Sequence, residues 1–129
     1  MRIIFAGTTR QAAMVLKHIA NSQHEIVAVV TRLDAPVGRK ATLTQSPVAD
    51  IADSLDLRVI KTNKFDAEND QQISDLQPDL GVVIAYGALL KRSTLEIPSH
   101  GWLNLHFSLL PEWRGAAPVQ HSILSGNRI

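Results

Sequence analysis

Short apolar segments alternate with polar and helical ones along most of the chain. Residues 2–6, 25–30 and 80–85 are almost continuously apolar, which is typical of strands buried on both faces of a parallel sheet. Between the first two of these segments, residues 11–21 carry apolar side chains at helical spacing. This order of strand, helix and strand predicts a βαβ unit with a right-handed crossover.

The later segments extend this arrangement. Residues 57–61 form a third, shorter predicted strand, and residues 91–95 form a short predicted helix. Ser46 and Asp66 are the expected N-cap residues of predicted helices over 47–55 and 66–77. Residues 31–46 show no period and are predicted to be irregular.

The strand order follows from these segments. With 101–107 as a fifth strand, the sequence predicts an α/β fold with a Rossmann-like, doubly wound, mostly parallel sheet in the order 3-2-1-4-5. A ligand crevice is expected beside strands 1, 4 and 5.

The fifth predicted strand places polar groups on one face. Trp102, Asn104 and His106 share that face, and the alternate residues Leu103, Leu105 and Phe107 are expected to be buried on the other. A turn over 108–115 and a helix over 116–125 follow, with Pro118 in the first turn of the helix.

Two interpretations of Asn104 and His106 remain open at this stage. Their N–H groups are suited to holding one developing oxyanion. Alternatively, both side chains hydrogen-bond to the neighbouring backbone and hold a loop in place.

Composition narrows the class of protein. The chain has 129 residues, 45% of them apolar, a mean hydropathy of +0.02 and no cysteine. These values predict one small globular domain and exclude disulfides and thiolate metal sites within the chain. There is no run of 18 apolar residues and no signal-peptide pattern. A cytoplasmic protein with no membrane contact is therefore expected.

Charge is unevenly spread although the net charge is +1. Residues 1–49 hold six basic and two acidic side chains, a balance of +4, while residues 50–79 hold three and eight, a balance of −5. Arg39 and Lys40 make the irregular 31–46 segment basic, which suits either a contact with a phosphate backbone or a solvated surface loop.

Gly7 does not mark a dinucleotide site. The run from Gly7 reads Gly-Thr-Thr-Arg-Gln-Ala and lacks the further glycines of that fingerprint. We therefore expect a tight strand-to-helix turn, with Thr8 or Thr9 as the helix N-cap.

A known family shares the motifs of the second half. The run Asn-Leu-His-Phe-Ser-Leu-Leu-Pro-Glu-Trp-Arg-Gly over 104–115 resembles the signature of the folate-dependent formyltransferases. Within that family, residues 113–120 most resemble the methionyl-tRNA formyltransferases, and residues 2–8, 36–39, 46–48 and 82–87 agree in order along the chain.

The resemblance implies an activity. It implies transfer of a formyl group from the co-substrate 10-formyltetrahydrofolate to the α-amino group of methionyl-initiator tRNA, in translation initiation, without a metal. Asn104 and His106 would then be catalytic and would hold the formyl oxygen. Arg39 and Lys40 would bind tRNA. Arg114 and Gly115 would fix the loop, although Arg114 could instead contact substrate directly. The implied folate-binding residues are Tyr86, Gly87, Leu89, Ser108, Leu109, Leu110 and Pro111.

The family also continues beyond the point where this sequence ends. Its members carry further strands, an Asp that assists the His, and a smaller tRNA-binding domain, whereas no Asp follows Asp79 here. Residues 1–129 are therefore expected to be a partial catalytic domain, truncated on its C-terminal side and of little activity alone. A full-length monomer is expected. Two alternatives stay open: a formyltransferase for a small amine, such as a sugar nucleotide or glycinamide ribotide, and a non-catalytic α/β binding module.

Overall fold

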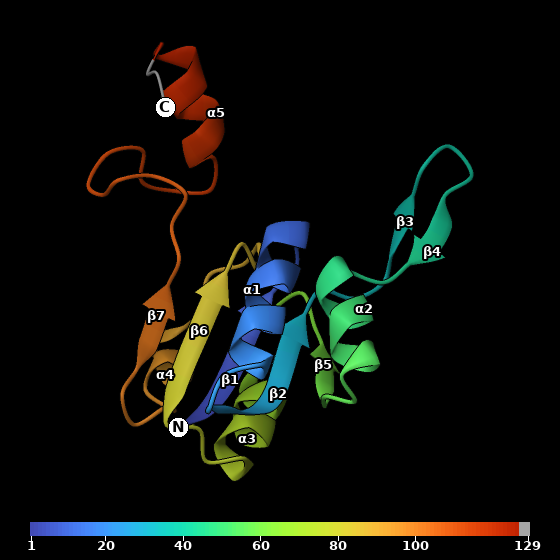
Figure 1. Cartoon of the computed structure of the whole chain (residues 1–129), viewed down its shortest axis with the longest axis vertical. Helices are drawn as coiled ribbons and strands as arrows, with labels where there is room; N and C mark the ends of the chain where they lie inside the picture. Colours follow the sequence, from blue (N-terminus) through green and yellow to red (C-terminus); the bar gives the residue numbers. More distant parts are fainter. Residues whose placement is uncertain (127–129) are drawn as a thin grey trace.

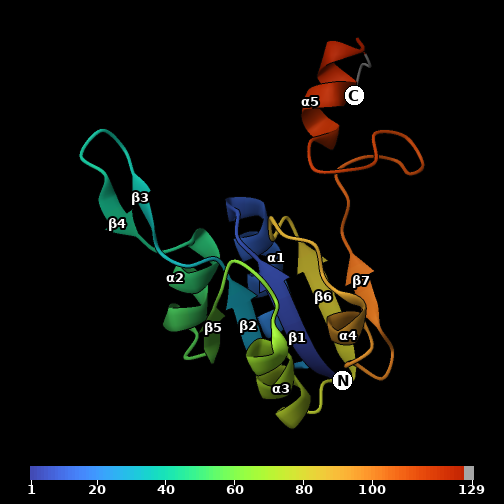
Figure 2. The same cartoon turned by 180° about the vertical axis from the view of Figure 1, so that it is seen from behind.

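A five-stranded parallel sheet with helices on both faces forms the body of the molecule in a computed structural model, which describes residues 1–126 (Figures 1 and 2). The strand order is β5-β2-β1-β6-β7. The predicted order 3-2-1-4-5 and the doubly wound α/β class are thus confirmed. The strands are β1 (Arg2–Gly7), β2 (Glu25–Thr31), β5 (Val59–Lys61), β6 (Leu80–Ile84) and β7 (Trp102–Asn104).

The helices lie where the periodicity predicted them, with small differences at their ends. They are α1 (Arg10–Ala20), α2 (Pro47–Ser54), α3 (Ala67–Asp75), α4 (Arg92–Leu95) and α5 (Pro118–Leu124). The hydroxyl of Ser46 accepts from the backbone N–H of Ala49 at 3.0 Å, and Asp66 accepts from the backbone of Asn69 at 3.1 Å. Hydrogen bonds from the side chain and backbone of Asn69 lower the pKa of Asp66 below its usual value. Both predicted N-caps are confirmed.

Two apolar cores lie on opposite sides of the sheet, because alternate residues of its strands point to opposite faces. Phe5, Val29 and Ile84 pack against Leu16 and Val48 under α1 and α2. The other core contains the neighbouring strand residues together with Phe65, Ile73 of α3 and Tyr86. Burial on both faces explains why the central strands are continuously apolar.

The buried hydroxyl of Tyr86 donates to the carbonyl of Thr62 at 2.6 Å. Burial raises the pKa of Tyr86 from 10.0 to about 12. The unfolded chain therefore loses this proton near pH 10, while the folded chain keeps it until about pH 12. This contribution to stability is complete below pH 10 and is lost as the pH rises through 12.

We expect Tyr86→Phe to lower the free energy of unfolding at pH 8 by about 1 kcal/mol, because the Thr62 carbonyl loses its partner. The variant should also show a shallower fall in stability between pH 10 and 12. Urea unfolding of both proteins from pH 8 to 12 measures this. Parallel curves for the two proteins would contradict the assignment to Tyr86.

Residues 31–46 are not irregular as predicted. They contain an antiparallel hairpin of β3 (Ala35–Val37) and β4 (Thr42–Thr44), closed by a hydrogen bond from the N–H of Ala41 to the carbonyl of Gly38 at 3.1 Å. The hairpin extends away from the body of the molecule at the carboxyl-terminal edge of the sheet (Figures 1 and 2). Its strands have three residues each, too few for the alternation to stand out in the sequence.

The prediction for 101–107 is partly wrong. The strand ends at Asn104, with one further ladder bond from the N–H of Leu105 to the carbonyl of Val83 at 3.1 Å. The side chains that were expected to be buried are exposed instead. The exposed fraction is 61% for Leu103, 48% for Leu105 and 41% for Phe107. Among residues 1–126, α1 and α2 pack over β1, β2 and β5, and no helix covers this face of β7 (Figure 1).

No helix in the described part of the chain is long and apolar enough to cross a membrane.

Candidate functional site

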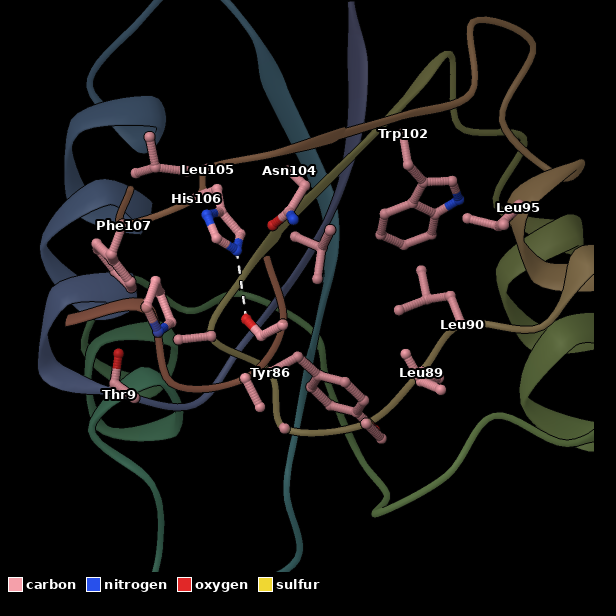
Figure 3. A pocket seen from close by; sticks show the side chains of 17 residues that line it. Thr9, Tyr86, Leu89, Leu90, Leu95, Trp102, Asn104, Leu105, His106 and Phe107 are labelled. Carbon is pink, nitrogen blue, oxygen red and sulfur yellow. Dashed lines mark hydrogen bonds between the residues drawn. The ribbon is translucent and has the colours of Figure 1, made fainter. Parts of the chain in front are cut away.

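A cavity of about 770 Å³ opens at the carboxyl-terminal edge of β6 and β7 (Figure 3). Parallel strands place their following loops at one edge of the sheet, so residues far apart in sequence meet there. Three segments form most of the lining: 85–90 after β6, 104–107 at the end of β7, and Gly115, Ala116 and Pro118 at the start of α5. Thr9, Val83, Leu95 and Trp102 complete it.

Asn104 and His106 lie side by side and point into this cavity (Figure 3). Asn104 ends β7 and His106 follows two residues later in the loop, so the end of the strand brings both to the cavity. The side-chain amide of Asn104 makes no hydrogen bond within residues 1–126 and borders the cavity. His106, in contrast, does hold a loop: its Nδ1 lies 3.0 Å from the Ser108 hydroxyl and its Nε2 lies 3.3 Å from the Gly115 carbonyl.

Residues 86–90 form one wall of the cavity, and the turn between β1 and α1 supports this wall. Thr9 caps α1 by accepting from the backbone N–H of Ala12 at 3.3 Å, and the Thr8 hydroxyl donates to the carbonyl of Tyr86 at 2.9 Å. Of the two N-cap candidates, Thr9 is therefore the correct one. Thr8 instead links this turn to the start of the 86–90 wall.

The wall itself is apolar, and its residues play different parts. The ring of Tyr86 packs 5.3 Å from that of Phe65 and belongs to the core, so only part of this residue borders the cavity. Leu89 is 94% exposed and offers a free apolar side chain. Gly87 contributes only backbone. Such a surface suits a flat heteroaromatic ring that needs few charged partners.

The Ser-Leu-Leu-Pro run lies elsewhere. Residues 108–111 are outside the cavity lining, on a loop that extends away from the sheet toward α5 (Figures 1 and 2). Leu109 is 89% exposed and Leu110 59% exposed. In the same loop, Arg114 donates to the carbonyl of Pro111 at 3.3 Å, a contact of the kind that the loop-fixing interpretation requires. The folate-binding role of residues 108–111 stays a prediction.

Sequence reasoning missed Trp102 as a site residue, although it shares a face with Asn104. Its indole N–H donates to the carbonyl of Thr94 at 3.0 Å, and its ring lies directly over Gly81. A Cβ at Gly81 would be 2.1 Å from that ring. The pairing of a glycine in one strand with a tryptophan in the next was the available signal.

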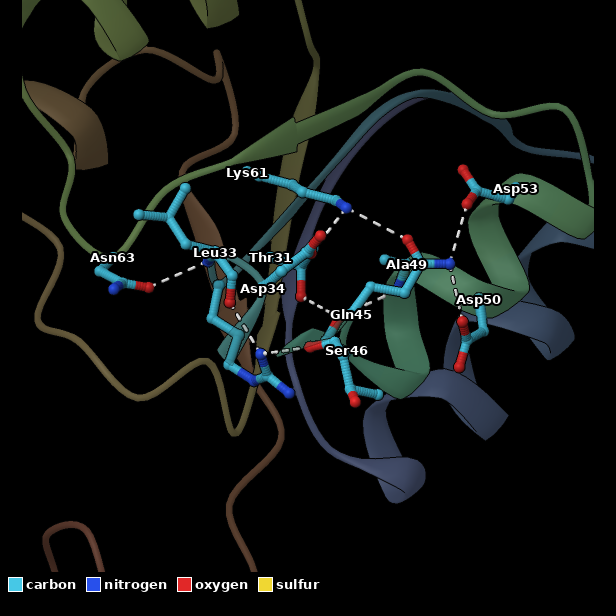
Figure 4. A network of polar contacts seen from close by, with 12 residues as sticks. Thr31, Leu33, Asp34, Gln45, Ser46, Ala49, Asp50, Asp53, Lys61 and Asn63 are labelled. Carbon is cyan, nitrogen blue, oxygen red and sulfur yellow. Dashed lines mark hydrogen bonds and ion pairs between the residues drawn. The ribbon is translucent and has the colours of Figure 1, made fainter. Parts of the chain in front are cut away.

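Arg39 and Lys40 are exposed in the turn between β3 and β4, a turn that lies away from the chain that follows β6 and β7 (Figure 1). A polar network fixes the base of their hairpin to the body of the molecule (Figure 4). The Gln45 amide donates to Asp50 at 2.7 Å and to Asp53 at 3.0 Å. Lys61 donates to Gln45 at 3.1 Å and to Asp34 at 2.7 Å. The hairpin therefore has a defined direction relative to the sheet.

No group of three or more His, Cys, Asp or Glu side chains that could hold a metal occurs within residues 1–126.

Comparison with known proteins decides the family. The family model described as formyl transferase matches residues 1–129. The chain belongs to the formyl transferase family. A methionyl-tRNA formyltransferase of Clavibacter sepedonicus is 50% identical over 129 residues, which are all of this chain and 42% of that protein. One of a Nocardioides species is 54% identical over all of this chain and 41% of its own length. The chain thus spans well under half the length of these relatives.

Solved structures agree with this formyltransferase fold. Glycinamide ribonucleotide transformylase 1 of Geobacillus kaustophilus superposes with a TM-score of 0.74 at 14% identity, covering 97% of this chain and 68% of that one. The corresponding enzyme of Symbiobacterium toebii gives 0.76 at 16% identity, covering 98% of this chain and 60% of that one. At such low identity these likenesses concern the fold alone.

Proposed function

We propose that this formyltransferase domain takes part in transferring a formyl group from N10 of 10-formyltetrahydrofolate to the α-amino group of methionyl-initiator tRNA. The observation that carries the proposal is the identity of about 50% to methionyl-tRNA formyltransferases along all 129 residues. The placement of Asn104 and His106 in one cavity supports it.

The chemistry needs hydrogen-bond donors at a developing negative charge. The amine attacks the formyl carbon, a C–N bond forms, and the carbonyl oxygen becomes an oxyanion. The Asn104 amide and, in its protonated form, the His106 imidazole are donors of the required kind, and such donors act best when they are held in place before the reaction. The bond from carbon to N10 then breaks, N10 takes a proton, and the attacking nitrogen loses one.

The 86–90 wall is proposed to receive the pteridine ring, with Tyr86, Gly87 and Leu89 contributing as the resemblance implies. Ser108, Leu109, Leu110 and Pro111 would approach the folate from the opposite side. Arg114 and Gly115 would hold their loop. The co-substrate is expected to bind without a metal.

A carboxylate that could help remove the amine proton is lacking from the cavity lining within residues 1–126. The resemblance places an Asp further along the chain. We therefore propose that residues 1–129 form a partial catalytic domain with little turnover alone, in a longer, monomeric and cytoplasmic protein. Formyl transfer by the isolated chain at the rate of a complete enzyme would contradict this.

The hairpin is proposed to contact the tRNA backbone through Arg39 and Lys40. Replacing both with alanine should weaken tRNA binding by about tenfold and reduce the slope of log K against log salt by about 2. Lys17→Ala with Arg58→Ala removes the same two residue types at exposed positions of the body and serves as the matched control. Equal loss in both double variants would assign the effect to net charge.

Two alternative functions can be distinguished from the proposed one by experiment. The solved relatives act on glycinamide ribonucleotide according to their names, so a small amine is one alternative acceptor. A non-catalytic binding module is the other. A chimera in which residues 1–129 replace the matching part of the Nocardioides relative can be offered methionyl-tRNA, glycinamide ribotide and an amino sugar nucleotide with labelled formyl-folate. Transfer to methionyl-tRNA above the other acceptors is expected. Preference for a small amine, or no transfer at all, would overturn the proposal.

A further inference from the structure

The Ser108 hydroxyl lies between His106 and the backbone of its own loop. Its Oγ is 2.6 Å from the carbonyl oxygen of Glu112 and 3.0 Å from Nδ1 of His106. A carbonyl oxygen can only accept a hydrogen bond, so the single hydroxyl proton of Ser108 is donated to Glu112. Only the lone pairs of Oγ remain to face the imidazole.

This arrangement determines which ring nitrogen carries the proton. Because Oγ can only accept from the ring, Nδ1 must be the donor. A neutral imidazole has one N–H, so its proton is on Nδ1 and its lone pair is on Nε2. The hydrogen bond at one nitrogen sets the state of the other, as in other histidine sites.

Nε2 is the nitrogen at the cavity. It faces the carbonyl oxygen of Gly115 at 3.3 Å, and both residues line the cavity (Figure 3). By the same rule the Gly115 carbonyl accepts only from an N–H on Nε2, so the protonated ring alone makes both contacts at once. In the neutral ring, a proton on Nε2 would require Ser108 to donate to Nδ1 and would leave the Ser108 and Glu112 oxygens 2.6 Å apart with no proton between them. The neutral ring therefore keeps its proton on Nδ1, and the longer 3.3 Å contact with Gly115 is the one that is lost. The protonated ring donates from Nε2 to an oxygen acceptor, and the neutral ring accepts a proton there. The Gly115 carbonyl marks the direction in which that N–H points.

We infer that Ser108 is a positioning residue that holds His106 in the Nδ1–H tautomer and thereby reserves Nε2 for proton transfer in the cavity. The tautomer is inferred only from the hydrogen bonds of Ser108 with His106 and Glu112. Its consequence for formyl transfer rests on the proposed function. This role differs from the folate contact that the motif implied for Ser108, and it uses the hydroxyl rather than the backbone.

The test reads the tautomer directly. The 129-residue chain is labelled with 15N-histidine, and the ring nitrogens are recorded across a pH titration. Comparison with His106→Gln identifies the His106 signals among the five histidines. In the neutral form we expect a protonated Nδ1 and an unprotonated Nε2. A neutral form with its proton on Nε2 would overturn the inference whatever the variants do.

Ser108→Ala should lose the preference for Nδ1–H, and Ser108→Thr, which keeps the hydroxyl, should retain it. If Ser108→Ala also disturbs the loop, the wild-type and threonine spectra still decide the question. An alanine variant with the wild-type tautomer would contradict the inference.

Kinetics of the chimera separate this inference from the proposed function. Ser108→Ala is expected to lower kcat on the order of tenfold and to change its pH profile, with KM for formyl-folate nearly unchanged and with recovery in Ser108→Thr. Absence of formyl transfer in the unsubstituted chimera would refute the proposed function and leave the tautomer result standing. An unchanged kcat in Ser108→Ala, with transfer intact, would refute the positioning role.

Discussion

Replacing His106 with alanine lowers kcat/KM for formyl transfer by about 10²- to 10³-fold in the chimera with the Nocardioides relative. The imidazole points into the cavity beside Asn104 (Figure 3), and loss of one preorganised donor to an oxyanion has an effect of this size. Asn104→Ala should show a loss of the same order, because its amide is the neighbouring donor. The initial rate of labelled formyl transfer to methionyl-tRNA measures both.

His100→Ala is the matched control. His100 is exposed just before β7, and its side chain is outside the cavity lining, so its rate should stay within about twofold of the unsubstituted chimera. Folding of each variant is checked by its unfolding midpoint. If the His106 and His100 variants lose the same activity, or if Asn104→Ala has no effect, the assignment of the cavity as the site of transfer is wrong.

Gly81→Ala destabilises the domain by about 3 kcal/mol, the upper part of the range for an overpacked site. The added Cβ would lie 2.1 to 2.5 Å from three atoms of the Trp102 indole. The ring is restrained by its hydrogen bond to Thr94 and by edge-to-face packing on Phe65 at 6.4 Å. A shift of the ring to relieve this overlap would break these contacts beside Asn104 in β7. Urea unfolding measures the loss of stability.

Gly38→Ala is the comparison for this prediction. An added Cβ meets nothing within 4 Å there, and the cost of its φ of +74° is about 1 kcal/mol. A double-mutant cycle with Trp102→Leu should show coupling for Gly81 and none for Gly38. A Gly81→Ala protein as stable as Gly38→Ala would contradict the close packing of the strand pair that positions the site.

The sheet could be predicted from the sequence because its strands are buried on both faces. Burial on both faces makes β1, β2 and β6 almost continuously apolar, and the short loops and handedness rules then leave little choice of order. Ser46 and Asp66 were identifiable as caps because capping depends on one side chain and its near neighbours. The placement of Asn104 at the carboxyl edge of the sheet followed from the same geometry, because Asn104 ends the fifth strand. His106 lies two residues beyond the strand and is held by the loop.

The remaining features depend on contacts that the local pattern does not record. The hairpin has only three-residue strands, and its base is fixed by Lys61 and Gln45, which are distant from its turn in sequence. The exposure of Leu103 depends on how far α1 and α2 extend over the sheet. The hydrogen bond between His106 and Ser108 depends on the path of the 107–115 loop. No periodic pattern in the sequence specifies that path, so this bond could not be predicted.

The most direct test of the central claim is a titration of the 15N-labelled chain with a stable analogue of 10-formyltetrahydrofolate, followed by the amide signals of each residue. We predict saturable changes at Tyr86, Gly87 and Leu89 and at Asn104 and His106, with the hairpin signals of Arg39 and Lys40 unchanged. Saturable changes that leave both Asn104 and His106 untouched, or no binding by either this chain or the chimera, would contradict the claim that this cavity is where the formyl group is transferred.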